Sequence, residues 1–238
     1  MRRDVLDLRE FYAGALGGAA REMVSRKVAE AWGSLSGLDV LGFGYATPFL
    51  AKVRGDARRV IAAMPAQQGV EAWPIGAAND AVLVDEAALP FPAGLFDRIL
   101  AVHALEEADS PLAVLHELGR SLAPQGRMIL VVAARHGFWS DAESSPFGHG
   151  RPFSRRQLEQ LVREAELEPA GWTRALYAPP VAWAARWAET FEQAGAVLWP
   201  PLAGLVLLEA QKRTHAVSPA APARAGARVF APGALRPA

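Results

Sequence analysis

Leu38-Asp39-Val40-Leu41 runs straight into Gly42-Phe43-Gly44-Tyr45-Ala46-Thr47, and this stretch decides how the chain folds. The first four residues form a short, largely apolar run that predicts a strand, and the glycines predict a tight turn behind it. Pro48 is a favourable first residue of a helix and Gly55 a favourable stop, so residues 49–54 predict a short helix. The order is therefore strand, glycine loop, helix.

Further apolar runs of strand length follow this unit and alternate with amphipathic segments. The runs cover residues 60–64, 81–84, 96–102 and 128–133. Between the last two, Ser110 is placed to cap a helix that begins with a proline. Apolar strands that alternate with helices are typical of parallel sheets covered on both faces. The sequence therefore predicts an α/β fold, a Rossmann-like doubly wound, mostly parallel sheet with helices on both faces.

Helical patterns flank these strands on both sides. Residues 5–32 predict a helix, because the apolar residues from Val24 to Trp32 recur on one face. Ser154 and Gln157 form a capping-box pattern, which predicts the start of another helix.

The remaining stretches complete the main domain and set its boundaries. Residues 172–177 and 202–209 are strand-like, and residues 181–194 predict a helix between them. From residue 214 the composition shifts to Ala, Pro, Arg and Gly without periodicity, which is typical of a flexible tail. We therefore divide the chain into an N-terminal helical segment (1–37), a main domain (38–213) and a tail (214–238).

The composition narrows the range of partners. The chain has 238 residues, enough for one large domain with a buried core, and 51% of them are hydrophobic. Its 25 basic residues balance 25 acidic ones, so we expect no nucleic-acid and no membrane partner. There is no cysteine and no uninterrupted apolar run near the start, which favours a cytoplasmic location. A small molecule or a protein is the expected partner.

Several blocks behind the glycine loop carry a family resemblance. They are Asp85-Glu86-Ala87-Ala88-Leu89-Pro90-Phe91-Pro92, Leu95-Phe96-Asp97-Arg98-Ile99-Leu100, His103-Ala104-Leu105-Glu106, residues 115–122 and Ala123-Pro124-Gln125-Gly126-Arg127. Together with the loop they resemble class I S-adenosylmethionine-dependent methyltransferases of the small-molecule (type 11-like) group. The likeness spans residues 38–133, so it implies that 38–213 is a methyltransferase-like domain.

The resemblance implies a cofactor, S-adenosylmethionine, lying across the carboxyl ends of the first strands, where open α/β sheets bind ligands. The glycines would let the backbone approach it closely, and Asp85 would accept a hydrogen bond from its adenine, unless that side chain merely caps a loop. His103 would face the reacting methyl group, unless it is a structural histidine. The implied cofactor-binding residues are Gly42, Gly44, Tyr45, Met64, Asp85, Glu86 and His103.

Three departures from the family pattern affect this site. Ala46 replaces the third glycine, and Val40 stands where an acidic residue is usual, two places before the first glycine. Asp39 is displaced by one residue and so points to the opposite face of the strand. Met64 ends the second strand, where the family has an acidic residue that binds the ribose hydroxyls. The loss of that charge-assisted hydrogen-bond pair would cost about 1.5 to 3 kcal/mol.

The segment after the fifth strand, residues 135–153, is rich in functional side chains. It holds two histidines, two arginines and several aromatic residues, and it lies at the carboxyl end of a central strand. We expect His149 or His136, besides His103, to supply a catalytic base, and Trp139, Phe147 and Arg151 to bind substrate, Arg151 through a carboxylate or phosphate. The alternative is a structural lid. The two loop histidines have no clear third ligand, so no metal is expected.

Trp183, Trp187 and Phe191 recur every four residues, which would place three rings on one helix face. Core packing is the default explanation for such a stripe. Trp199 follows closely, so these tryptophans are also candidates for a protein-binding surface.

Two functions follow from the sequence. The first is methyl transfer from S-adenosylmethionine to a small-molecule acceptor, or less readily to a protein. The second is a catalytically inactive methyltransferase-like protein that binds or regulates another protein, because three expected cofactor contacts are altered together.

Overall fold

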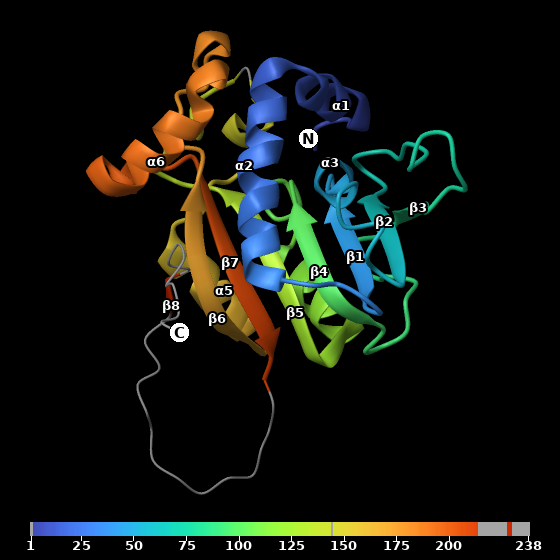
Figure 1. Cartoon of the computed structure of the whole chain (residues 1–238). Helices are drawn as coiled ribbons and strands as arrows, with labels where there is room; N and C mark the ends of the chain where they lie inside the picture. The colour runs from blue at the N-terminus through green and yellow to red at the C-terminus, as the bar shows by residue number, and fades with distance from the viewer. Residues whose placement is uncertain (1, 144, 214–227, 230–238) are drawn as a thin grey trace, which may run out of the picture.

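The fold is an open, twisted sheet with helices packed on it, as Figure 1 shows for a computed structural model. The structure describes residues 2–143, 145–213 and 228–229. The strands are β1 Asp39–Gly44, β2 Arg59–Pro65, β3 Ala81–Val84, β4 Phe96–Val102, β5 Leu122–Ala133, β6 Leu167–Ala175, β7 Leu205–Lys212 and β8 Arg228–Val229. The helices are α1 Val5–Ala13, α2 Ala15–Trp32, α3 Thr47–Leu50, α4 Pro111–Ser121, α5 Arg155–Glu164 and α6 Ala188–Leu198, with short 3₁₀ turns η1 Pro146–Gly148, η2 Ala182–Trp187 and η3 Pro200–Leu202.

The strand order is β3-β2-β1-β4-β5-β7-β6-β8. Strands β1 to β5 are mutually parallel, and β7 runs antiparallel to both β5 and β6. The order reverses between β1 and β4, and ligands of open α/β sheets bind at the carboxyl ends of the strands beside such a reversal. The predicted doubly wound, mostly parallel sheet is confirmed.

Helices cover both faces of the sheet, and each face has its own apolar core. In β5, Ile129 and Val131 belong to the cluster that includes Val24 of α2, whereas Met128 and Leu130 belong to the cluster of α4 and α5. This alternation follows from the two-residue period of a strand, whose successive side chains point to opposite faces. In Figure 1, α2 lies in front of the sheet and α5 behind it.

Most predicted strands are confirmed, and the largest differences concern helices. Residues 5–32 form two helices, because the chain breaks at Gly14, which ends α1 and precedes α2. The predicted helix 49–54 is shorter and begins earlier, as α3. The predicted helix 181–194 is divided into η2 and α6. Ser110 and the Ser154–Gln157 capping box cap α4 and α5 as predicted.

The predicted flexible tail, 214–238, lies outside the described residues except for Arg228–Val229, which pairs with β6. Among the helices that the structure describes, none is long and apolar enough to cross a membrane.

We expect Gly44→Ala to destabilise the fold. Gly44 has a φ of 79°, and an added Cβ would clash with the carbonyl oxygen of Val102 in β4. The left-handed backbone and the overpacking together would lower the free energy of unfolding by roughly 2 to 4 kcal/mol. Urea unfolding measures the change.

Gly55→Ala is the matched control, because its added Cβ meets nothing within 4 Å. Equal stabilities for the two variants would contradict a close approach of β1 to β4.

Candidate functional site

The glycine turn joins the end of β1 to β4 and α3. Tyr45 donates its backbone N–H to the carbonyl oxygen of Val102, with 2.8 Å between the atoms. Gly44 sits directly against the same carbonyl, and an added Cβ on Gly42 would clash with the side chain of Leu50 in α3. Both glycines are therefore required by packing inside the protein, whatever else the turn binds.

The N-terminal segment, which we define as residues 2–13, covers the carboxyl ends of the strands. The buried guanidinium of Arg2 donates from Nη2 to the carbonyl oxygen of Ala104, at 2.7 Å, and forms a 2.6 Å ion pair with Glu86 behind β3. The backbone N–H of Val5 donates to the carbonyl oxygen of Gln68 behind β2. This segment therefore ties the ends of β2, β3 and β4 together.

An aromatic cluster lies under the N-terminal segment, next to His103. The hydroxyl oxygen of Tyr12 and Nε2 of His103 are 2.8 Å apart, and both side chains are buried. The ring of Tyr12 stacks on that of Tyr45, and the ring of Phe147 lies against His103, with 4.5 Å between centroids. Burial, helped by the charge of Arg3, lowers the pKa of His103 to about 3, so its imidazole is neutral at physiological pH.

Several of the buried polar atoms that lack a hydrogen-bond partner within the described structure lie along the same edge, and others lie elsewhere, such as those of Trp32, Ser121 and Trp172. Neither amide atom of Gln68, nor Nε of Arg2, nor Oε2 of Glu106 has a hydrogen-bond partner among the described residues. Glu106 is held by its other oxygen, which accepts from the backbone N–H of Ala133 at 3.0 Å. Burial raises the pKa of Glu106 to about 7. Such atoms are costly to bury unless a ligand or water satisfies them.

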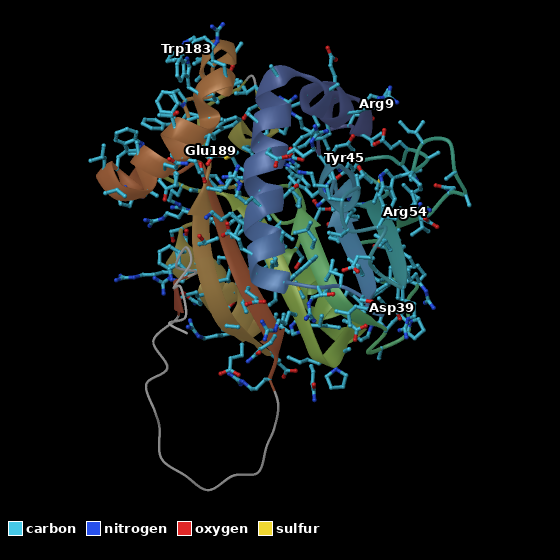
Figure 2. All side chains as sticks on the ribbon, viewed as in Figure 1. Arg9, Asp39, Tyr45, Arg54, Trp183 and Glu189 are labelled. Carbon is cyan, nitrogen blue, oxygen red and sulfur yellow. The ribbon has the colours of Figure 1, made fainter. Side chains whose placement is uncertain are left out.

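The altered positions lie where the sequence places them. Met64 is fully buried at the carboxyl end of β2. Tyr45 is buried too, and its hydroxyl donates to Glu71 at 2.9 Å. Asp39 lies at the opposite end of β1 from Tyr45, as Figure 2 shows, and its carboxylate pairs with Arg58. The carboxylate of Asp39 therefore cannot replace the acidic residue that is usual at the position of Val40.

The two acidic residues that directly follow β3, Asp85 and Glu86, lie in different environments. Asp85 is exposed, and its Oδ1 accepts the backbone N–H of Ala87 at 2.9 Å, which is the loop-capping arrangement. Glu86 is largely buried and engaged by Arg2. Adenine recognition by Asp85 is therefore available only through the part of its carboxylate that the cap leaves open.

The segment 135–153 divides into a buried and an exposed part. Trp139 is enclosed, donates its ring N–H to the carbonyl oxygen of Ala178, and packs on Gly204, so it supports the fold instead of facing a substrate. Phe147 is also buried, against His103. Our prediction of direct substrate contact is therefore not supported for Trp139, because no face of its ring is free.

The polar residues of this segment lie nearer the surface. His149 contacts the guanidinium of Arg3, and its Nε2 lies 3.0 Å from the carbonyl oxygen of Glu143. Arg151 is exposed and donates to the carbonyl oxygen of Ala108 at 2.9 Å. His136 is exposed and has no side-chain hydrogen bond within the described part of the chain.

Sequence reasoning missed four residues of this edge: Arg2, Tyr12, Gln68 and Glu106. Glu106 lies in one of the blocks that carry the resemblance, but no spacing rule marked its side chain. The other three are brought to the edge by tertiary packing alone.

The tryptophan stripe differs from its default interpretation. Trp183 and Trp187 are 59% and 55% exposed, so core packing is wrong for both. Both lie in η2, a 3₁₀ turn, instead of the predicted helix. Figure 2 shows Trp183 far from Tyr45, at the outer end of the molecule. Trp199 is half-buried against Gly195.

Residues 19–170 match the model of a family described as a methyltransferase domain. Since this range covers more than half of the chain, the chain belongs to this methyltransferase domain family. No curated protein matches the sequence.

Solved structures share the fold at low sequence identity. An S-adenosylmethionine-dependent methyltransferase of Thermotoga maritima, described as a possible histamine N-methyltransferase, is 17% identical, with 88% of this chain and 96% of that one covered and a TM-score of 0.61. A complex of the Haloferax volcanii Trm112 activator with a methyltransferase candidate matches at 19%, covering 89% and 99%, with a TM-score of 0.60. The Burkholderia thailandensis 1,6-didemethyltoxoflavin-N1-methyltransferase, with bound S-adenosylhomocysteine, matches at 19%, covering 83% and 78%, with a TM-score of 0.53.

The family and the fold predicted from the sequence are therefore confirmed. S-adenosylmethionine is the cofactor that the family and these neighbours support. The roles of individual residues stay predictions.

We expect the stability of the protein to depend on Glu106 and on pH. A folded-state pKa of about 7, above the usual 4.5, means that the folded protein favours the neutral acid. The free energy of unfolding therefore falls as pH rises from about 4.5 to about 7, by up to about 3 kcal/mol, and then levels off.

Glu106→Gln removes this titration, so its stability relative to the native protein should increase over the same pH range. Thermal or urea unfolding at pH 5, 6, 7 and 8 tests this. A stability difference that is constant with pH would contradict a buried, neutral Glu106.

Proposed function

We propose that the protein transfers a methyl group from S-adenosylmethionine to a small-molecule acceptor. The observation that supports this is the row of buried, unpartnered polar atoms at the carboxyl edge of a methyltransferase-family sheet. That edge adjoins the reversal of strand order between β1 and β4, where such sheets bind ligands. A buried polar ligand there would satisfy atoms that are otherwise costly to enclose.

The groups at this edge that could hold the cofactor are neutral side chains, backbone groups and the acids after β3, and the N-terminal segment covers them in this structure. The turn at Gly42 and Gly44 is packed against Leu50 and Val102, so it offers backbone groups only. After β2, the strand whose acid is replaced by Met64, Gln68 offers an amide that has no partner within the residues that the structure describes. Asp85 and Glu86 stand behind β3. The bound cofactor would supply a methyl group on a sulfonium centre, ready for displacement.

The chain's own residues would then align the acceptor, exclude water and remove a proton where needed. The rings of Tyr12 and Phe147 enclose His103 from two sides. Because the pKa of His103 is about 3, its ring does not accept a proton near neutral pH, and we assign it to positioning. Proton removal falls to His149 or His136, which lie outside that apolar enclosure.

We expect titration calorimetry to detect S-adenosylmethionine and S-adenosylhomocysteine at micromolar affinity. Gln68→Ala removes two amide hydrogen-bonding groups that have no partner in the described part of the chain, and it should weaken binding by about tenfold. Gln67→Ala is the matched control, because Gln67 is exposed and donates to Asp109. Its affinity should equal that of the unaltered protein.

Absence of binding at millimolar cofactor, by protein with native circular dichroism, would contradict the proposed methyl transfer. Equal losses in Gln67→Ala and Gln68→Ala would contradict the role of Gln68.

A second candidate function is protein binding without catalysis. The exposed apolar side chains around α6 favour it: Trp183, Trp187, Val197 and Leu198 are each more than half exposed. Large exposed apolar patches are rare on soluble monomeric proteins, and those that occur often mark interaction surfaces. The partner would present an apolar surface to these tryptophans, with Trp199 at the edge of the patch.

We expect Trp187→Ala to release any stoichiometric partner that co-purifies with the protein, while leaving the unfolding midpoint nearly unchanged, since the side chain is exposed. Ile75→Ala is the control, because Ile75 is 93% exposed and lies outside the patch. If a partner co-purifies with the protein and Trp187→Ala still retains it, the proposed role of this surface in binding is contradicted.

A further inference from the structure

A cavity of about 450 Å³ opens between α4 and α5, beside the edge already described. Arg135, which follows β5, and Arg151 both line it. Their segments are held together, because Arg135 donates its backbone N–H to the carbonyl oxygen of Phe153 at 3.1 Å and residues 134 and 153 form a parallel bridge. Two arginines of the segment 135–153 therefore border one hollow.

These guanidinium groups keep most of their hydrogen-bonding capacity. Within the described ranges, the side chain of Arg135 makes no hydrogen bond or ion pair. Arg151 donates one hydrogen bond, from Nη2 to the carbonyl oxygen of Ala108. A guanidinium has five N–H donors in a fixed fork that matches carboxylate and phosphate oxygens.

Two carboxylates also line the cavity, but glutamines hold them. Asp109 accepts from Gln67 at 3.0 Å, and Glu164 accepts from Gln160 at 2.8 Å. Neither carboxylate is ion-paired with Arg135 or Arg151 in the described structure. The amide hydrogen bonds leave the negative charges of Asp109 and Glu164 in place, so an external anion would bind by direct hydrogen bonds to the two arginines, which neither carboxylate occupies.

The remaining walls are apolar. Leu112, Phe153 and Leu161 contribute to the lining, and all three are only half-buried, so part of each faces the hollow. Sites for small molecules combine such apolar walls with a few polar groups that fix orientation. This cavity therefore suits a molecule with an apolar body and one oxyanion.

The cavity also adjoins the candidate methyl-transfer edge. Arg151 and Asp109 line a second hollow, of about 340 Å³, together with Glu106 and His149. Glu106 belongs to the buried polar row, and His149 is one of the two proposed bases. A molecule anchored at Arg135 and Arg151 would extend from there toward that edge.

We propose that Arg135 and Arg151 bind the carboxylate or phosphate of a small molecule whose apolar part lies against Leu112 and Phe153. The oxyanion site stands on the cavity itself. The further statement that the bound molecule is the methyl acceptor rests on the proposed function. If it holds, the acceptor is an organic acid or a phosphate ester.

Nuclear magnetic resonance titration with benzoate and with phenyl phosphate tests the site in the unaltered protein. We expect saturable shifts of the backbone amides of Leu112 and Phe153 with at least one of them, and the stronger binder distinguishes carboxylate from phosphate. Arg135→Gln and Arg151→Gln should each weaken that binding by about tenfold or more. Benzyl alcohol, the neutral analogue, should bind more weakly than benzoate.

Arg156→Gln is the matched control. Arg156 is exposed in the first turn of α5, carries the same charge and does not line the cavity, so its binding should be unchanged. No saturable shift with either anion, equal binding of benzyl alcohol, or an equal loss in Arg156→Gln would each overturn the oxyanion site.

The same samples separate this inference from methyl transfer. Calorimetry with S-adenosylhomocysteine reads the cofactor edge, and Arg135→Gln should leave its affinity unchanged. Loss of cofactor binding with intact anion binding would overturn only the proposed methyl transfer. Cofactor binding without anion binding would overturn only the oxyanion site.

Discussion

The contact on which the rest of the structure depends is the close approach of the end of β1 to β4. Tyr45 donates to the carbonyl oxygen of Val102, and Gly44 adopts a φ of 79° against the same group. A side chain at Gly44 would force the two strands apart. Because this turn fixes where β1 stops, it also fixes where α3 begins and where the carboxyl edge of the sheet can receive other groups.

What occupies that edge is the protein's own N-terminal segment. Burying a guanidinium such as Arg2 is costly without a charged partner and acceptors, and Glu86 and the carbonyl oxygen of Ala104 supply them. The same burial holds His103 neutral and raises the pKa of Glu106 to about 7. The pKa values at this edge therefore depend more on the N-terminal segment that buries it than on the residues of the strands.

The segment after β5 serves two purposes in one stretch of chain. Trp139 and Phe147 pack inward, and this packing holds His149 and Arg151 at the surface. A loop carried on a rigid sheet can place polar groups precisely only if part of it is anchored. The structural-lid and substrate-site interpretations of this segment are therefore compatible, because each applies to different residues.

The amino-acid sequence by itself determined the sheet, the glycine turn, the caps of α4 and α5, and the family. These features are local: strand period, glycine conformation and capping depend on neighbours along the chain. The sequence also located the departures at Val40, Ala46 and Met64.

Tertiary structure alone decided that Arg2, Tyr12 and Gln68 meet at the edge, that Trp183 and Trp187 face outward, and that Arg135 joins Arg151 in one cavity. Such contacts join residues far apart in sequence, and no spacing along the chain encodes them.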